Sequence, residues 1–129
     1  MGNKNAVLHK EHIRQKQRCN AFFDRIGEHQ LDKLIRALAS VKKFCDVFGK
    51  QIITPGPNTN IYKSLEFIEK LQTEYRDEFV DDWDLFFSFP VNELNGYSRM
   101  VFPLYCTNLL KDIKGYYGVD KVNQIILYD

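Results

Sequence analysis

The amino-acid sequence predicts a compact all-α domain of four to five helices, with an antiparallel helical hairpin at its N-terminal end. Three observations support this prediction. Apolar residues recur every three or four positions along most of the chain. Glycine or proline follows the main apolar stretches, where helices commonly stop. The 129 residues are 44% apolar and 27% charged, which suits a chain that buries one core. We therefore expect a single domain over residues 1–129.

The first two predicted helices cover about residues 5–26 and 29–48. Gly27 and Gly49 supply the stops. The apolar positions of the first helix share one face: Leu8, Cys19, Phe22, Phe23 and Ile26. The second helix carries an almost unbroken stripe made of Leu31, Leu34, Ile35, Leu38, Val41, Cys45 and Phe48. Because only two or three residues link them, these helices are predicted to fold back as the antiparallel hairpin.

A loop is predicted at residues 50–60, where two prolines, a glycine and two asparagines disfavour regular structure. One long helix is predicted after it, up to about Phe86. Its apolar positions are spaced by three or four residues: Ile61, Leu65, Ile68, Leu71, Tyr75, Phe79, Trp83 and Phe86. A rival interpretation of its end is a strand, because Trp83, Leu85, Phe87 and Phe89 occupy alternate positions.

Two further helices complete the predicted fold. Ser98 is a candidate N-cap for a helix over about residues 99–114, and Gly115 follows it. Pro103 is expected to kink this helix or to delay its start. Val119, Val122 and Ile126 favour a last short helix, although residues 125–128 also resemble a strand.

Positive charge is concentrated at the front of the chain. Residues 1–50 hold 11 Lys and Arg against 5 Asp and Glu, a net charge of +6, whereas the remaining residues carry a net charge of −5. A row of cations at helical spacing can follow the phosphates of a nucleic acid. The alternative is that these cations have no binding role and form the solvated face of two amphipathic helices. The candidate nucleic-acid contacts are Lys10, Arg14, Arg18, Arg25, Lys33 and Arg36.

Negative charge is concentrated between residues 74 and 84. On one continuous helix these carboxylates would fall within about 160° of arc. Like charges at this spacing destabilise a helix, which suggests that the row is used. It suits a cation, a basic protein surface or the basic helices of the chain itself; a solubilising surface is the interpretation without function. The candidate acidic docking face is Glu74, Asp77, Glu78, Asp81, Asp82 and Asp84.

Residues typical of catalysis or metal binding are sparse. The three cysteines are widely spaced and are predicted to be buried free thiols: Cys19, Cys45 and Cys106. The three histidines show no zinc-ligand spacing, and residues 74–85 lack the glycine of a calcium-binding loop. No phosphate-binding loop or hydrolase motif is present. We therefore expect no enzyme, no cofactor and no metal.

The predicted function is that of a small non-enzymatic modulator, inhibitor or adaptor. It would dock through the acidic face on a larger protein that processes nucleic acid. The alternative is a nucleic-acid-binding protein that uses the basic N-terminal helices. A second copy of the chain is a further partner that these surfaces suit. No apolar run reaches the roughly 18 residues that a membrane span needs, and no secretory leader is recognisable, so a cytoplasmic protein is expected.

Overall fold

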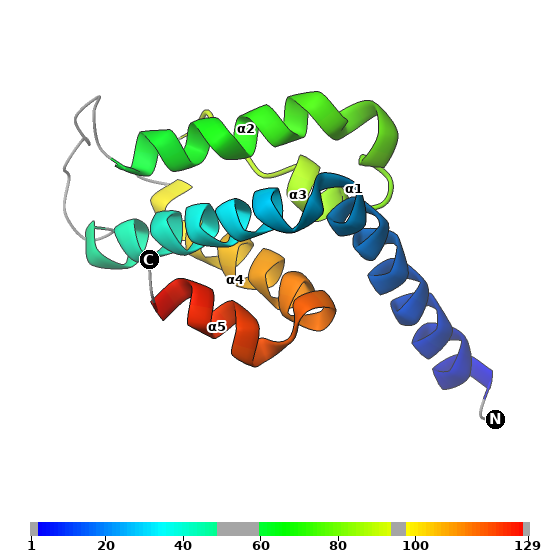
Figure 1. Ribbon diagram of the computed structural model, residues 1–129. Coiled ribbons are helices and arrows are strands. Elements are labelled where there is room, and N and C mark those ends of the chain that lie inside the picture. Colours follow the sequence, from blue (N-terminus) through cyan, green and yellow to red (C-terminus); the bar gives the residue numbers. More distant parts are fainter. Residues whose placement is uncertain (1–2, 49–59, 94–97, 128–129) are drawn as a thin grey trace.

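The computed structural model describes the backbone of residues 3–48, 60–93 and 98–127, and the side chains of residues 18–46, 61–93 and 100–127 (Figure 1). These ranges contain helices and no strand: α1 (Asn3–Phe48), α2 (Asn60–Phe79), α3 (Asp84–Phe87), α4 (Ser98–Tyr117) and α5 (Val119–Leu127). The predicted all-α class is confirmed. The strand interpretation of residues 83–89 is wrong, and residues 125–127 belong to α5.

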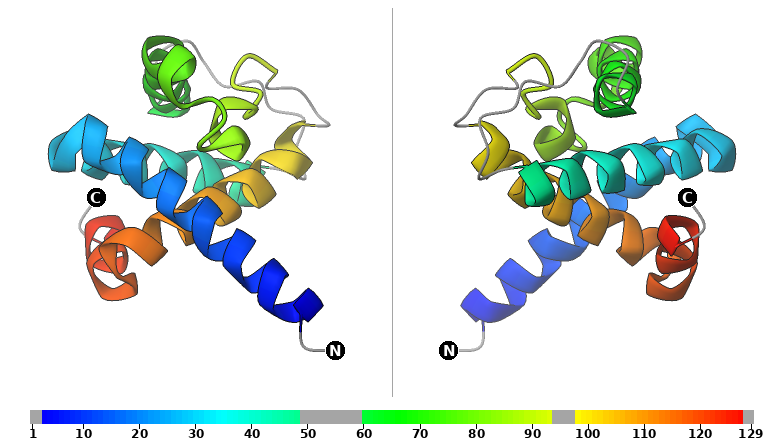
Figure 2. Two further views of the ribbon diagram at one scale, coloured as in Figure 1. Left: turned by 90° about the vertical axis from the view of Figure 1, so that its right-hand side faces the viewer. Right: turned by 90° about the vertical axis from the view of Figure 1, so that its left-hand side faces the viewer.

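Gly27 divides α1 into two segments. Its backbone angles, φ 84° and ψ 164°, lie in a region that is open essentially to glycine alone. The predicted stop after residue 26 is therefore confirmed as a break. The first segment leads away from the rest of the fold toward the N-terminus, whereas residues 28–48 run antiparallel to α2 (Figures 1 and 2). The antiparallel pair therefore consists of residues 28–48 and α2. The break at Gly27 changes the direction of the chain but does not reverse it (Figure 1).

Gly27→Ala is expected to lower the free energy of unfolding by about 1–3 kcal/mol. No atom lies within 4 Å of the position that an added Cβ would occupy, so the loss comes from backbone strain alone. Gly115→Ala is the matched control, since Gly115 lies inside α4 and its added Cβ also meets no atom. The control should stabilise the protein by up to about 1 kcal/mol. Urea denaturation measures both changes, and equal effects would contradict the role given to Gly27.

The core lies where both segments of α1 meet α2, α3 and α4, and Phe22 is at its centre. Phe22 is fully buried. Six aromatic rings surround it at centroid distances of 5.4–6.2 Å: Phe23, Tyr75, Phe79, Trp83, Phe86 and Phe87. Several of these pairs are edge-to-face, which is a favoured arrangement of aromatic rings. The core is thus held by one dense aromatic cluster from α1, α2 and the segment after it.

The predicted long helix through Phe86 is wrong, because α2 ends at Phe79 and a turn precedes α3. The amides of Asp82 and Trp83 both donate to the carbonyl of Phe79, which closes this turn. On a continuous helix Phe87 and Phe89 would point about 160° apart. The turn instead buries both of them against the core. Burial of the aromatic residues therefore overrides the helical period at this end.

Helix α4 extends three residues beyond its predicted end, through Gly115 to Tyr117, and contains Pro103. Gly118 ends it with φ 95°, and its amide donates to the carbonyl of Lys114 at 2.9 Å. Helix α5 then packs against α1 and α4, so the predicted last helix is confirmed.

Candidate functional site

The six acidic candidates lie on three different elements. Glu74, Asp77 and Glu78 are exposed on α2. Asp81 is exposed and Asp82 is half-buried in the turn that follows, and Asp84 is exposed at the start of α3. The expectation that all six share one arc of a continuous helix is therefore wrong, since the helix stops at Phe79.

One basic candidate and one acidic candidate form an ion pair with each other within the chain. Arg25 Nε lies 3.6 Å from Glu78 Oε2, and both side chains are about half exposed. The Arg25 guanidinium also lies over the ring of Tyr75, 5.5 Å from its centroid. Such exposed pairs contribute about 0–1 kcal/mol. This contact fits the third use of the acidic row, pairing with the basic helices of the same chain, but it involves Arg25 and Glu78 alone among the described residues.

Four of the six carboxylates are exposed and form no ion pair with a described residue. Three of them follow one another at intervals of three or four residues, and we call these three, Glu74, Asp77 and Asp81, the outer acidic row; the fourth, Asp84, belongs to α3. Two further carboxylates on α2, Glu66 and Glu69, were not singled out from the sequence. They line a hollow of about 400 Å³ together with Lys70, Thr73 and Glu74. In the sequence, their spacing of three residues was the signal that Glu66 and Glu69 are neighbours on one helix face.

The basic candidates fall into two groups on either side of Gly27. Lys10 and Arg14 belong to the first segment of α1, and their side chains lie outside the described residues. Arg18 is exposed on the same segment. Lys33 and Arg36 are exposed on the second segment, beside α2. The six cations therefore lie on two helical segments, four before Gly27 and two after it.

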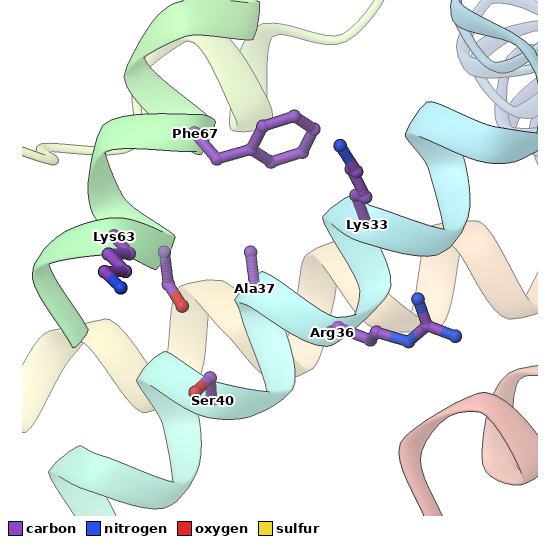
Figure 3. A pocket seen from close by; sticks show the side chains of 7 residues that line it. Lys33, Arg36, Ala37, Ser40, Lys63 and Phe67 are labelled. Carbon is purple, nitrogen blue, oxygen red and sulfur yellow. The ribbon is translucent and has the colours of Figure 1, made fainter. Parts of the chain in front are cut away.

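An open hollow of about 410 Å³ lies between the second segment of α1 and α2. Its lining residues are Lys33, Arg36, Ala37, Ser40, Lys63, Ser64 and Phe67. Lys33 and Phe67 face each other at one side of the hollow and Lys63 lies at the other, whereas Arg36 points away from it (Figure 3). We call this hollow the basic groove. Lys63 and Phe67 come from α2 and were not among the sequence-based candidates, because their proximity to Lys33 depends on how the helices pair.

The three cysteines are buried free thiols, as the sequence predicted. Burial, followed by the nearby charge of Asp112, raises the pKa of the Cys19 thiol to about 12. Burial also raises the pKa of Cys106 far above its ordinary value. In the described part of the chain, no three His, Cys, Asp or Glu side chains are grouped so that they could hold a metal ion.

The thiols of the native protein are expected to resist iodoacetamide at pH 8. A thiol of pKa 12 is ionised to only about one part in 10⁴ at this pH, and the thiolate is the form that reacts. Mass spectrometry after a timed exposure should show no label on the native protein and three labels on the protein in urea. Rapid labelling of one native cysteine would contradict this result and would favour a catalytic thiol.

The chain matches no known protein family, no curated protein and no solved structure in three separate comparisons. Among the described residues, no helix combines the length and the apolar character that crossing a membrane requires.

Proposed function

We propose that this protein is a small non-enzymatic modulator or adaptor that docks on a basic surface of a larger nucleic-acid-processing protein. The outer acidic row, formed by Glu74, Asp77 and Asp81, is the observation that carries the proposal. These carboxylates are exposed and unpaired among the described residues. Glu74 and Asp77 lie about one turn apart on α2, and Asp81 lies in the turn that follows, so the row presents several negative charges to solvent, as a phosphate backbone does.

The energetics of the row support an external partner. Like charges three or four residues apart destabilise a helix by about 0.2–0.5 kcal/mol per pair. Arg25 offsets part of this repulsion, but it contacts Glu78 and not the outer row. Cations of a partner surface would offset the rest and would also accelerate association.

The test compares two triple variants that remove the same charge. Glu74→Gln/Asp77→Asn/Asp81→Asn neutralises the outer acidic row. Asp46→Asn/Glu93→Gln/Asp120→Asn is the matched control, because these three residues are also exposed and lie outside both the row and the hollow that Glu74 lines. Each protein is used as bait in nuclease-treated extract and eluted with rising salt.

The wild type and the control are expected to retain the same proteins, and duplex DNA added as a competitor should release them. The outer-row variant should lose them while keeping the melting temperature of the control. Retention by the outer-row variant, or no competition by DNA, would overturn the proposal.

Nucleic-acid binding by the basic front of the chain is the second candidate. It is supported by the first segment of α1, which carries Lys10, Arg14 and Arg18 and leads away from the rest of the fold (Figure 2). Arg14→Glu/Arg18→Glu should weaken binding to duplex DNA and reduce the salt dependence of log K by about 1.8, for two lost phosphate contacts. An unchanged affinity would exclude this candidate.

A further inference from the structure

The basic groove has a lining that differs from those of the other described hollows. Its cations come from two helices, Lys33 from α1 and Lys63 from α2, whereas Arg36 lies at its edge and points away (Figure 3), and no carboxylate lines it. The two other described hollows of similar size are each lined by Glu66 and Glu69. The electrostatic field inside the basic groove therefore favours an anion, whereas the other two hollows disfavour one.

The groove also offers polar and aromatic groups. Ser40 and Ser64 contribute hydroxyls that can donate hydrogen bonds to phosphate or sugar oxygens. Phe67 is half-buried, so its ring is fixed by the core while part of it lines the groove. Ala37 lies between Lys33 and Ser40 along α1 and adds a second apolar surface (Figure 3). A ligand that satisfies this lining carries a negative charge and a flat apolar ring.

We infer that the basic groove binds a nucleotide unit, either free or as part of a single strand. The phosphate lies at the ammonium group of Lys33, which faces Phe67, and Lys63 adds positive charge at the far side of the hollow (Figure 3); the base packs on the exposed part of Phe67. The volume of about 410 Å³ falls within the range of small-molecule sites. This inference does not depend on the outer acidic row, which lies toward the opposite end of α2.

The test is an amide NMR titration at low ionic strength with three probes: adenosine monophosphate, inorganic phosphate and a deoxythymidine hexanucleotide. The expected result is a shift of the amide signals of Lys33, Ala37, Ser64 and Phe67. Saturation by adenosine monophosphate identifies a free nucleotide as the ligand. Binding of the hexanucleotide alone identifies a single strand.

Matched variants assign the contacts. Lys33→Gln/Lys63→Gln should lower affinity by about tenfold, and it should reduce the salt dependence for a single strand by about 1.4. Lys43→Gln/Lys70→Gln is the control, because it removes one exposed lysine from each of the same two helices outside the groove. This control should change affinity by less than about twofold. Phe67→Leu should lower affinity by about fivefold or more through lost stacking.

Three results would overturn the inference. The first is the absence of shifts with both nucleotide probes. The second is an equal loss of affinity in the two lysine variants, which would mean that overall charge and not the groove is responsible. The third is equal affinity for inorganic phosphate and adenosine monophosphate, which would remove any role for the base. The outer-row variant should bind nucleotide like the wild type, so this inference and the docking proposal fail independently.

Discussion

Replacement of Phe22 by alanine is expected to lower the free energy of unfolding by about 3–5 kcal/mol. The side chain is fully buried and is in contact distance of six other rings, so its removal leaves a cavity that the fixed cluster cannot fill. A domain of this size has a total stability of about 5–15 kcal/mol. The substitution therefore removes a large fraction of it.

Phe22→Leu keeps the measurement quantitative if the alanine variant does not fold. It retains most of the buried apolar volume but loses the edge-to-face contacts with Tyr75 and Phe79. An intermediate loss is expected from urea denaturation. Leu104→Ala is the control, because Leu104 is 65% exposed on α4 and should change stability by less than about 0.5 kcal/mol. Similar losses for Phe22→Ala and Leu104→Ala would contradict the central place of Phe22.

Trp83→Phe is expected to lower the free energy of unfolding by about 2–4 kcal/mol. The Trp83 indole N–H donates to Asp112 Oδ2 at 2.8 Å, which ties the segment after α2 to α4. Hydrogen bonds to charged groups contribute about 1.5–3 kcal/mol, and the smaller ring also loses part of its packing. The ring of Trp83 stacks on Phe86 and meets Phe23 edge-to-face, so a phenylalanine keeps part of these contacts.

A double-mutant cycle with Asp112→Ala separates the hydrogen bond from the packing, because alanine leaves the indole N–H of Trp83 without this acceptor. If the indole N–H and the Asp112 carboxylate are coupled, the double variant should be about 1 kcal/mol or more less destabilised than the sum of the single variants. Additive losses would contradict this coupling. Trp83 is the only tryptophan of the chain, so its fluorescence reports the undocking of this segment directly in the wild type and in Asp112→Ala.

The helices were predictable where the apolar period and the backbone signals agree. The stripe of residues 31–45 is buried as predicted, and Gly27 breaks α1 where a stop was predicted. The spacing of apolar residues did not predict the end of α2, because Trp83 and Phe86 keep the same spacing after Phe79, the last residue of this helix. Gln72 is the informative exception. It is buried on the apolar side of α2, and its Nε2 donates to the carbonyls of Phe86 in α3 and of Phe89 just after it. The presence of Gln72 on the apolar face of α2 was the sequence signal that backbone carbonyls of a later segment pack against this face.

The sign of the charge in each region was predictable from the sequence, but the arrangement of the charged side chains in space was not. The sequence located the excess of cations in residues 1–50 and the excess of carboxylates in residues 74–84. It did not show that Arg25 and Glu78 meet, that Asp82 is half-buried, or that Lys63 and Phe67 complete a groove with Lys33. These relations arise from how both segments of α1 pack against α2 and the turn after it, which no local pattern specifies.

The central position of α1 has a consequence for synthesis of the chain. Its apolar faces are covered by helices that the ribosome makes much later, and contacts such as Tyr116 with Asp24 and Lys121 with Glu28 join residues about ninety positions apart. At roughly 5–20 residues per second, translation from Phe48 to Tyr117 takes on the order of ten seconds. During that interval the part of α1 that α4 later covers has no partner to pack against. The nascent chain must therefore stay dispersed by the charges on α1 and α2 or by a chaperone until α4 emerges.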